Sequence, residues 1–152
     1  EGIQMEVAVE SDCAPLHELT RDILVKSDGV RTMRDPTRGG LATTLNELAL
    51  TSGCGMIIRE MDIPVKDTVK GACEILGFEP LYLANEGKLV AIVSRDSAPT
   101  VLETMKNHPQ GRAAAIIGTV VDQPKGKVLL ETSLGNKRIL DMLSGEQLPR
   151  IC

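Results

Sequence analysis

The order of helical and strand-like patterns along the chain constrains its fold more than any other feature. Over most of the chain, segments with apolar residues at helical spacing alternate with short apolar segments typical of strands. Toward the end, strand-like segments follow one another and are separated by turns. This order predicts an α+β fold with a mixed β-sheet and helices packed on it. Helices are expected at 13–27, 41–52, 68–76 and 97–105, and strands at 3–9, 30–34, 56–59, 89–93, 113–121, 128–130 and 138–140.

Several residues at the ends of these segments predict local detail. Ser11 or Asp12 is expected to cap the first helix, and Asp67 the third. The run 80–84 is expected to form a short helical turn, and Gly118 to mark a bulge. The run 89–93 is continuously apolar, which indicates a strand buried on both faces.

Length and composition exclude several classes of protein. With 152 residues, of which 42% are hydrophobic, the chain fits one soluble domain. Its net charge of −4 and its only two aromatic residues, Phe78 and Tyr82, argue against nucleic-acid binding. No apolar run approaches the ~20 residues needed to span a bilayer. The start at Glu1 lacks an initiator Met and a signal peptide, so we expect a section of a longer protein.

Four cysteines lie far apart, and none belongs to a C-x-x-C pair. Their spacing favours neither a zinc site nor a disulfide framework and indicates a reducing, cytoplasmic location. Cys13 is expected in the first turn of a helix and Cys54 at the start of a strand. Cys73 lies on the apolar stripe of a helix, where a free cysteine acts as a small hydrophobe.

The fourth cysteine, Cys152, is the last residue of the sequence and ends a segment that we expect to be a mobile tail at 143–152. In an extended tail, Arg150 points to the same side as Cys152, and its guanidinium favours the reactive thiolate. The domain itself is expected at 1–142. Two interpretations remain open: a thiol that carries a group, or a cysteine without a role on a frayed end.

The loop 35–40 follows an expected strand and leads directly into an expected helix, an arrangement that binds anions. Gly39 and Gly40 would allow a phosphate to approach closely, Thr37 offers a hydroxyl and Arg38 a bidentate guanidinium. Asp35 offers a carboxylate to a metal ion or hydroxyl. An ordinary tight connection, in which the glycines only relieve steric conflict, explains the pattern equally well.

A second candidate is the turn Asn85-Glu86-Gly87-Lys88. Glu86 precedes a strand expected to be buried, so its carboxyl would lie at the mouth of the sheet, partly desolvated. Desolvation would raise the pKa of Glu86 and suit it to accept a proton. The alternative is a solvated turn glutamate paired with Lys88.

Three motifs together resemble the HypE family of hydrogenase maturation factors, the carbamoyl dehydratases. They are Met33-Arg34-Asp35-Pro36-Thr37-Arg38-Gly39-Gly40-Leu41-Ala42, Ala84-Asn85-Glu86-Gly87-Lys88 and the terminal Pro149-Arg150-Ile151-Cys152. The resemblance covers the whole chain, as the C-terminal half of that family. The Asp-x-Thr-x-Gly-Gly element alone indicates only the wider superfamily of aminoimidazole ribonucleotide (AIR) synthetase and selenophosphate synthetase. The fold implied is the three-layer C-terminal domain of AIR synthetase (PurM).

The resemblance implies a mechanism. HypF places a carbamoyl group on Cys152, ATP phosphorylates the resulting thiocarboxamide, and Glu86 removes a nitrogen proton to leave a thiocyanate. Asp35, Thr37, Arg38, Gly39 and Gly40 would line the nucleotide cleft, with Asn85 and Arg150 in support. The cyano group would pass to the HypC–HypD complex for the [NiFe] centre.

The resemblance also implies what this chain lacks. The N-terminal half of the family supplies most contacts to ATP and Mg²⁺ and the main surface of a homodimer. This chain alone is therefore expected to fold but to be inactive. Alternatives are another ATP-using enzyme domain of the superfamily, which needs no terminal thiol, and a binding module without catalysis.

Overall fold

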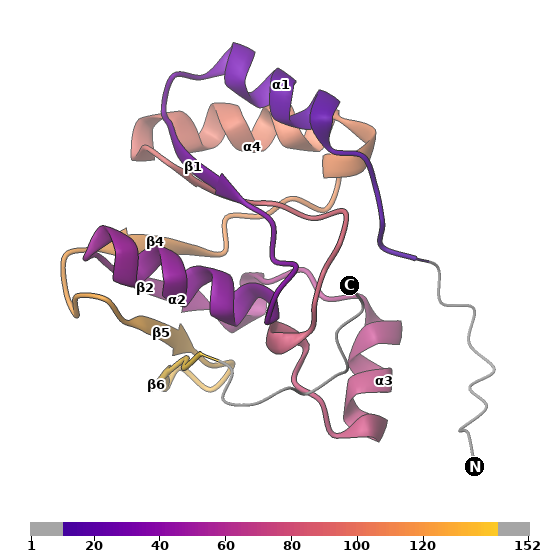
Figure 1. The fold of residues 1–152 in the computed structure, drawn as a ribbon, viewed down its shortest axis with the longest axis vertical. Coiled ribbons are helices and arrows are strands. Elements are labelled where there is room, and N and C mark those ends of the chain that lie inside the picture. Colours follow the sequence, from indigo (N-terminus) through magenta and orange to yellow (C-terminus); the bar gives the residue numbers. More distant parts are fainter. Residues whose placement is uncertain (1–10, 143–152) are drawn as a thin grey trace.

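The computed structural model describes residues 11–142. The strand expected at 3–9 and the tail expected at 143–152 lie outside this range. The helices are α1 (His17–Lys26), α2 (Gly40–Ser52), α3 (Asp67–Leu76) and α4 (Ala98–Asn107), with short 3-10 turns at Glu60–Asp62, Pro80–Tyr82, Arg95–Ser97 and Pro109–Gly111. The strands are β1 (Val30–Arg34), β2 (Gly55–Arg59), β3 (Val90–Val93), β4 (Gly118–Val121), β5 (Val128–Glu131) and β6 (Lys137–Ile139). Figure 1 shows their arrangement.

The described strands form two sheets. Strands β1 and β3 pair antiparallel, and the other four form a sheet in the order β4-β2-β5-β6. In this larger sheet β2 and β5 are parallel, whereas β2–β4 and β5–β6 are antiparallel. The expected α+β class, with a mixed sheet and helices packed on it, is confirmed.

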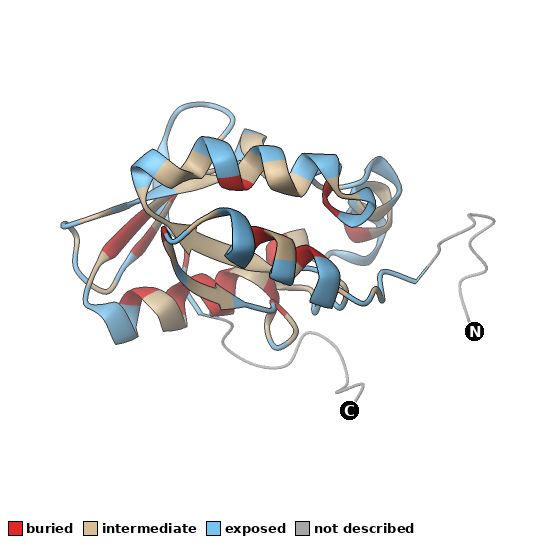
Figure 2. Ribbon diagram, turned by 90° about the horizontal axis from the view of Figure 1, so that it is seen from above, coloured by how far each residue is buried: buried red, intermediate tan, exposed pale blue. Residues whose placement is uncertain are grey.

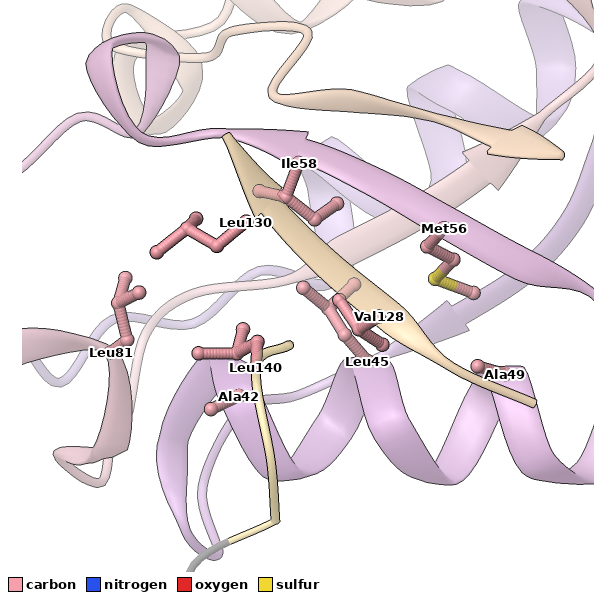
Figure 3. Close-up of a cluster of buried hydrophobic side chains, with 9 residues drawn as sticks. All are labelled: Ala42, Leu45, Ala49, Met56, Ile58, Leu81, Val128, Leu130 and Leu140. Carbon is pink, nitrogen blue, oxygen red and sulfur yellow. The ribbon is translucent and has the colours of Figure 1, made fainter. Parts of the chain in front are cut away.

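The larger hydrophobic core lies between α2 and the four-stranded sheet. Figure 3 shows three side chains of α2 facing apolar side chains of β2 and β5. Asn46, a buried polar residue of α2, donates from Nδ2 to the carbonyl oxygens of Ala42 (2.9 Å) and Leu140 (2.8 Å). Because an unpaired amide in the core would cost free energy, this pair of bonds lets Asn46 fix the chain after β6 onto α2. The core residues are Ala42, Leu45, Ala49, Met56, Ile58, Leu81, Val128, Leu130 and Leu140.

A smaller core lies between α1, α4 and the β1–β3 pair. Leu19, Ile23 and Val101 are its buried residues, and the two helices lie together on one side of the strands (Figure 1). The outer faces of these helices are exposed (Figure 2). Strand β3 contributes side chains to both cores, because successive side chains of a strand point to opposite faces. Val90 and Ile92 pack against the larger core and Val93 against the smaller, so both faces of β3 are covered, although each of its residues is only half-buried.

Several local predictions need correction. Helix α1 begins at His17, after Pro15, so neither Ser11 nor Asp12 caps it. Asp67 is the first residue of α3 and makes no capping bond. The strand expected at 113–121 is shortened to Gly118–Val121, and Gly118 pairs with Ile58 in regular register rather than forming a bulge. A Cβ at Gly118 would lie 2.3 Å from the Ile57 oxygen, so this glycine permits close approach of two strands.

Two other local predictions are confirmed. The run 80–84 contains the 3-10 turn Pro80–Tyr82. Cys73 is buried in α3, and burial raises the pKa of its thiol, as expected for a structural cysteine. Among residues 11–142, no helix has both the length and the apolar character needed to cross a membrane.

Replacement of Gly40 with alanine should destabilise the domain strongly. Gly40 has φ of 65°, and a Cβ there would lie 2.6 Å from the carbonyl oxygens of both Leu81 and Leu83. We expect the free energy of unfolding, measured by urea denaturation, to fall by about 2–5 kcal/mol, from the left-handed backbone and the overlap together. Gly77→Ala is the matched control, because Gly77 has φ of 71° but no atom of the described residues within 4 Å of an added Cβ. Equal losses in the two variants would show that the close approach at Gly40 contributes nothing.

Candidate functional site

The loop between β1 and α2 is ordered by its own side chains. The Thr37 hydroxyl donates a hydrogen bond to Oδ2 of Asp35. Chiefly because of this bond, with smaller help from the backbone and from Arg34, the pKa of Asp35 lies below its ordinary value. Asp35 is exposed and therefore presents a charged carboxylate at neutral pH.

Thr37→Val should raise the pKa of Asp35 toward its ordinary value, whereas Thr37→Ser, which keeps the hydroxyl, should leave it unchanged. Carboxyl NMR titration measures this pKa directly. Because the folded-state pKa is depressed, the bond stabilises the fold above the ordinary pKa of aspartate, and this contribution is lost as the pH falls through the folded-state pKa. Identical titration of Asp35 in the valine and serine variants would contradict this role of the hydroxyl.

The N terminus of α2 leaves donors available at the same loop. Among the described residues, no side chain caps this helix, and its first turn holds no acidic residue. Within residues 11–142, the buried Oγ1 atom of Thr43 has no hydrogen-bond partner. A Cβ at Gly39 would lie only 2.2 Å from this atom. Arg38 is exposed beside them. Uncapped N–H groups, an orphaned hydroxyl and an exposed guanidinium fit an anionic phosphate group.

The two glycines of the loop differ in their surroundings. Gly39 is half-buried with φ of 66°, whereas Gly40 is buried against the backbone of residues 81–83. The group that approaches Gly40 closely is therefore the protein's own backbone at residues 81–83. The phosphate-binding role of Gly40 stays a prediction.

The second candidate stretch, 84–88, lies directly beside this loop. The N–H of Asn85 donates to the carbonyl oxygen of Pro36 at 3.1 Å, and Asn85 Nδ2 donates to the carbonyl oxygen of Leu83 at 2.7 Å. The structure thus joins two motifs that lie far apart in the sequence. Asn85 acts here by holding the turn against the phosphate-binding candidate.

Glu86 is exposed, so the described residues do not provide the desolvation that the sequence led us to expect. It is not paired with Lys88 either, because the Lys88 ammonium lies 3.6 Å from the Asp12 carboxylate. Glu86 and Gly87 instead form one wall of a hollow of about 310 Å³, whose other residues are Cys13, Ala14 and Pro15. Asn85, the neighbour of Glu86 in the chain, bonds to Pro36 of the loop that contains Asp35.

The remaining cysteines show which thiols are accessible. Cys13 is exposed and precedes α1, which corrects the prediction that it lies in the first turn of a helix. Cys54 is half-buried and directly precedes β2, close to its expected place. Cys152 and Arg150 lie outside the described residues, and their roles stay predictions. Within residues 11–142 no three His, Cys, Asp or Glu side chains gather to hold a metal ion.

Two residues of this region were not singled out as site residues from the sequence. The sequence predicts a helix cap at Ser11 or Asp12, but the Asp12 carboxylate contacts the turn that contains Glu86. Thr43 lies on the first turn of α2 and offers a hydroxyl near Gly39. Neither has a sequence signal of its own, because each position depends on contacts between separate segments.

The fold and the paired loops define the class of this chain. The family model "AIR synthase related protein, C-terminal domain" matches residues 4–131, and the chain belongs to this family. Carbamoyl dehydratase HypE of Azotobacter vinelandii is 54% identical over 152 residues, which are 100% of this chain and 45% of that relative. The chain therefore spans about half the length of the curated relatives it matches.

Solved structures give the same relationship. The crystal structure of hydrogenase maturation protein HypE in complex with ATP has a TM-score of 0.90 and 42% identity, over 99% of this chain and 46% of that one. A chain of the HypE–HypF complex has a TM-score of 0.87 and 43% identity, over 93% of this chain and 46% of that one. The expected resemblance to HypE and to the AIR synthetase C-terminal fold is thus confirmed.

Proposed function

We propose that this chain forms part of an ATP-dependent carbamoyl dehydratase that makes the cyano ligands of [NiFe]-hydrogenase. The observation that carries the proposal is the identity of about half of all residues to HypE over the whole chain. The hydrogen bond between the Asn85 N–H and the Pro36 carbonyl supports it, because this bond holds the proposed base beside the proposed phosphate loop.

The chemistry begins with a carbamoyl group on the sulfur of Cys152, which gives a thiocarboxamide. ATP, when bound, supplies the phosphoryl group that turns the carbonyl oxygen into a leaving group, and the first of the two nitrogen protons is lost to solvent as the C=N double bond forms. Glu86 then accepts the second proton from nitrogen, the C≡N bond is completed and the C–O bond breaks with release of phosphate. The sulfur is left with a thiocyanate, which has lost one water relative to the thiocarboxamide.

The described residues have separate roles in this scheme. Arg38 and the backbone N–H groups at Thr37, Gly39 and Gly40 would hold phosphate oxygens at the positive end of α2, while the Thr37 hydroxyl keeps its bond to Asp35. Asp35, whose carboxylate is charged at neutral pH, would be available to the Mg²⁺ that accompanies ATP. Asn85 holds the turn, and Arg150 would favour the thiolate of Cys152.

The partners follow from the same chemistry. A carbamoyl donor and a cyano acceptor must both reach one sulfur, and we assign these roles to HypF and to the HypC–HypD complex. The solved complex of HypE with HypF supports the first assignment. The full-length form would be a cytoplasmic homodimer.

Mass spectrometry of the C-terminal peptide tests the proposal. The chain is grafted in place of the matching portion of A. vinelandii HypE and incubated with HypF, carbamoyl phosphate and ATP. We expect the peptide containing Cys152 to gain the mass of a carbamoyl group and then to lose the mass of one water. Without a portion equivalent to the rest of HypE, the chain alone should release no phosphate from ATP. An unmodified peptide, with HypF verified as active, would refute the proposal in favour of a binding module.

A further inference from the structure

The carboxylate of Asp12 lies against the turn that contains Glu86. Its Oδ2 atom accepts a hydrogen bond from the backbone N–H of Glu86 at 3.1 Å and lies 3.6 Å from Nζ of Lys88. A hydrogen bond to an ionised carboxylate is stronger than one between neutral groups. The Asp12 side chain therefore contacts both the backbone of Glu86, the proposed base, and the side chain of Lys88.

The backbone around Asp12 adds a second contact with the same turn. Gly87 has φ of 48°, and a Cβ there would lie 1.9 Å from the carbonyl oxygen of Asp12 and 2.6 Å from the amide nitrogen of Ala14. Residues 12–14 therefore cross directly over Gly87. The segment belongs to no helix or strand, and α1 begins only at His17.

We propose that Asp12 is a positioning residue for Glu86, an inference that rests on the proposed function. Asn85 and Gly87 hold the turn on either side of Glu86, and the bond from the Glu86 N–H to Asp12 adds a restraint at the Glu86 peptide itself, next to its exposed side chain. The ion pair contributes less, because the side chains of Lys88 and Asp12 are 50% and 41% exposed and water screens them. The hydrogen bond to the Glu86 N–H is the contact through which Asp12 acts.

Three variants in the full-length graft separate these contacts. Asp12→Ala removes both, Asp12→Asn keeps an oxygen acceptor for the Glu86 N–H, and Lys88→Gln removes only the ion pair. Because a displacement of about 1 Å can cost roughly 100-fold in rate, we expect Asp12→Ala to lower kcat of dehydration by about 10–100-fold. The KM for ATP should stay unchanged. Asp12→Asn and Lys88→Gln should dehydrate at nearly the parent rate.

The preceding step is the internal control. Acceptance of the carbamoyl group from HypF uses Cys152 and not Glu86, so all three variants should accept it at the parent rate. A loss of acceptance in Asp12→Ala, or a loss of dehydration that Asp12→Asn fails to restore, would overturn the positioning role in favour of general damage to the fold.

A double variant distinguishes this inference from the proposed function. If Asp12 acts through Glu86, adding Asp12→Ala to Glu86→Gln should cause little further loss, since coupled residues are not additive. Full dehydration by Glu86→Gln would overturn both the role of Glu86 and that of Asp12. Loss of dehydration in Glu86→Gln with full activity in Asp12→Ala would overturn the positioning role alone.

Discussion

Cys152→Ser will abolish carbamoyl acceptance, and its C-terminal peptide will keep its unmodified mass after incubation with HypF, carbamoyl phosphate and ATP. The thiolate is the attacking species, and a serine hydroxyl without an adjacent base is not ionised near neutral pH. The substitution exchanges sulfur for oxygen and leaves the side chain otherwise unchanged. In cells that depend on the full-length variant, we expect hydrogenase without cyano ligands.

The other cysteines of the chain provide matched controls. Cys13→Ser removes an exposed thiol that lines the same hollow as Glu86, and Cys54→Ser removes a half-buried thiol that does not line it. Both variants should accept one carbamoyl group on Cys152 at the parent rate. Normal installation of cyano ligands by Cys152→Ser would show that a residue other than Cys152 carries the transferred group. This outcome would refute the proposed function.

Glu86→Gln will separate the two steps of the reaction. Glutamine has the size of glutamate but cannot accept the nitrogen proton, so carbamoylated Cys152 should accumulate while dehydration slows by about 10²–10⁴-fold. The measurement is the ratio of the two modified peptide masses over time. Since acceptance does not need this carboxylate, its rate should be unchanged.

Glu74 allows the same substitution to be made at a position away from the candidate site. It is an exposed glutamate on α3, so Glu74→Gln makes the same change in charge away from the turn. Its dehydration rate should equal that of the parent. Equal slowing in both variants would mean that the loss of one negative charge, rather than of a base at position 86, limits the reaction.

The β3 strand illustrates how much of the fold the sequence predicts. Its run of apolar residues indicates burial on both faces; alternate side chains of β3 do pack against two different cores, but each residue of the strand is only half-buried. The helices on either side followed from apolar spacing and were found within a few residues of their expected places. These features are local, because periodicity alone determines which side of a helix or strand is buried.

The ends of elements and the burial of single side chains were harder to predict. Asp12 has the residue type of a helix cap, but α1 begins five residues later, and the Asp12 carboxylate bonds instead to a turn 74 residues away. Glu86 precedes a strand with both faces covered, yet its own side chain is exposed. Capping preferences are worth about 1 kcal/mol, and a tertiary hydrogen bond to a carboxylate can outweigh them.

Periodicity and motifs within short segments were enough to establish the α+β class, the membership of the family and the two loops that contain the candidate site. Three contacts became visible only in the folded chain: Asn85 bonds to Pro36, Gly40 accommodates the backbone of residues 81–83, and Asp12 holds the turn of Glu86. Each of these contacts joins segments far apart in the chain. Their geometry comes from the packing of α2 and the strands around shared cores, which no short segment specifies.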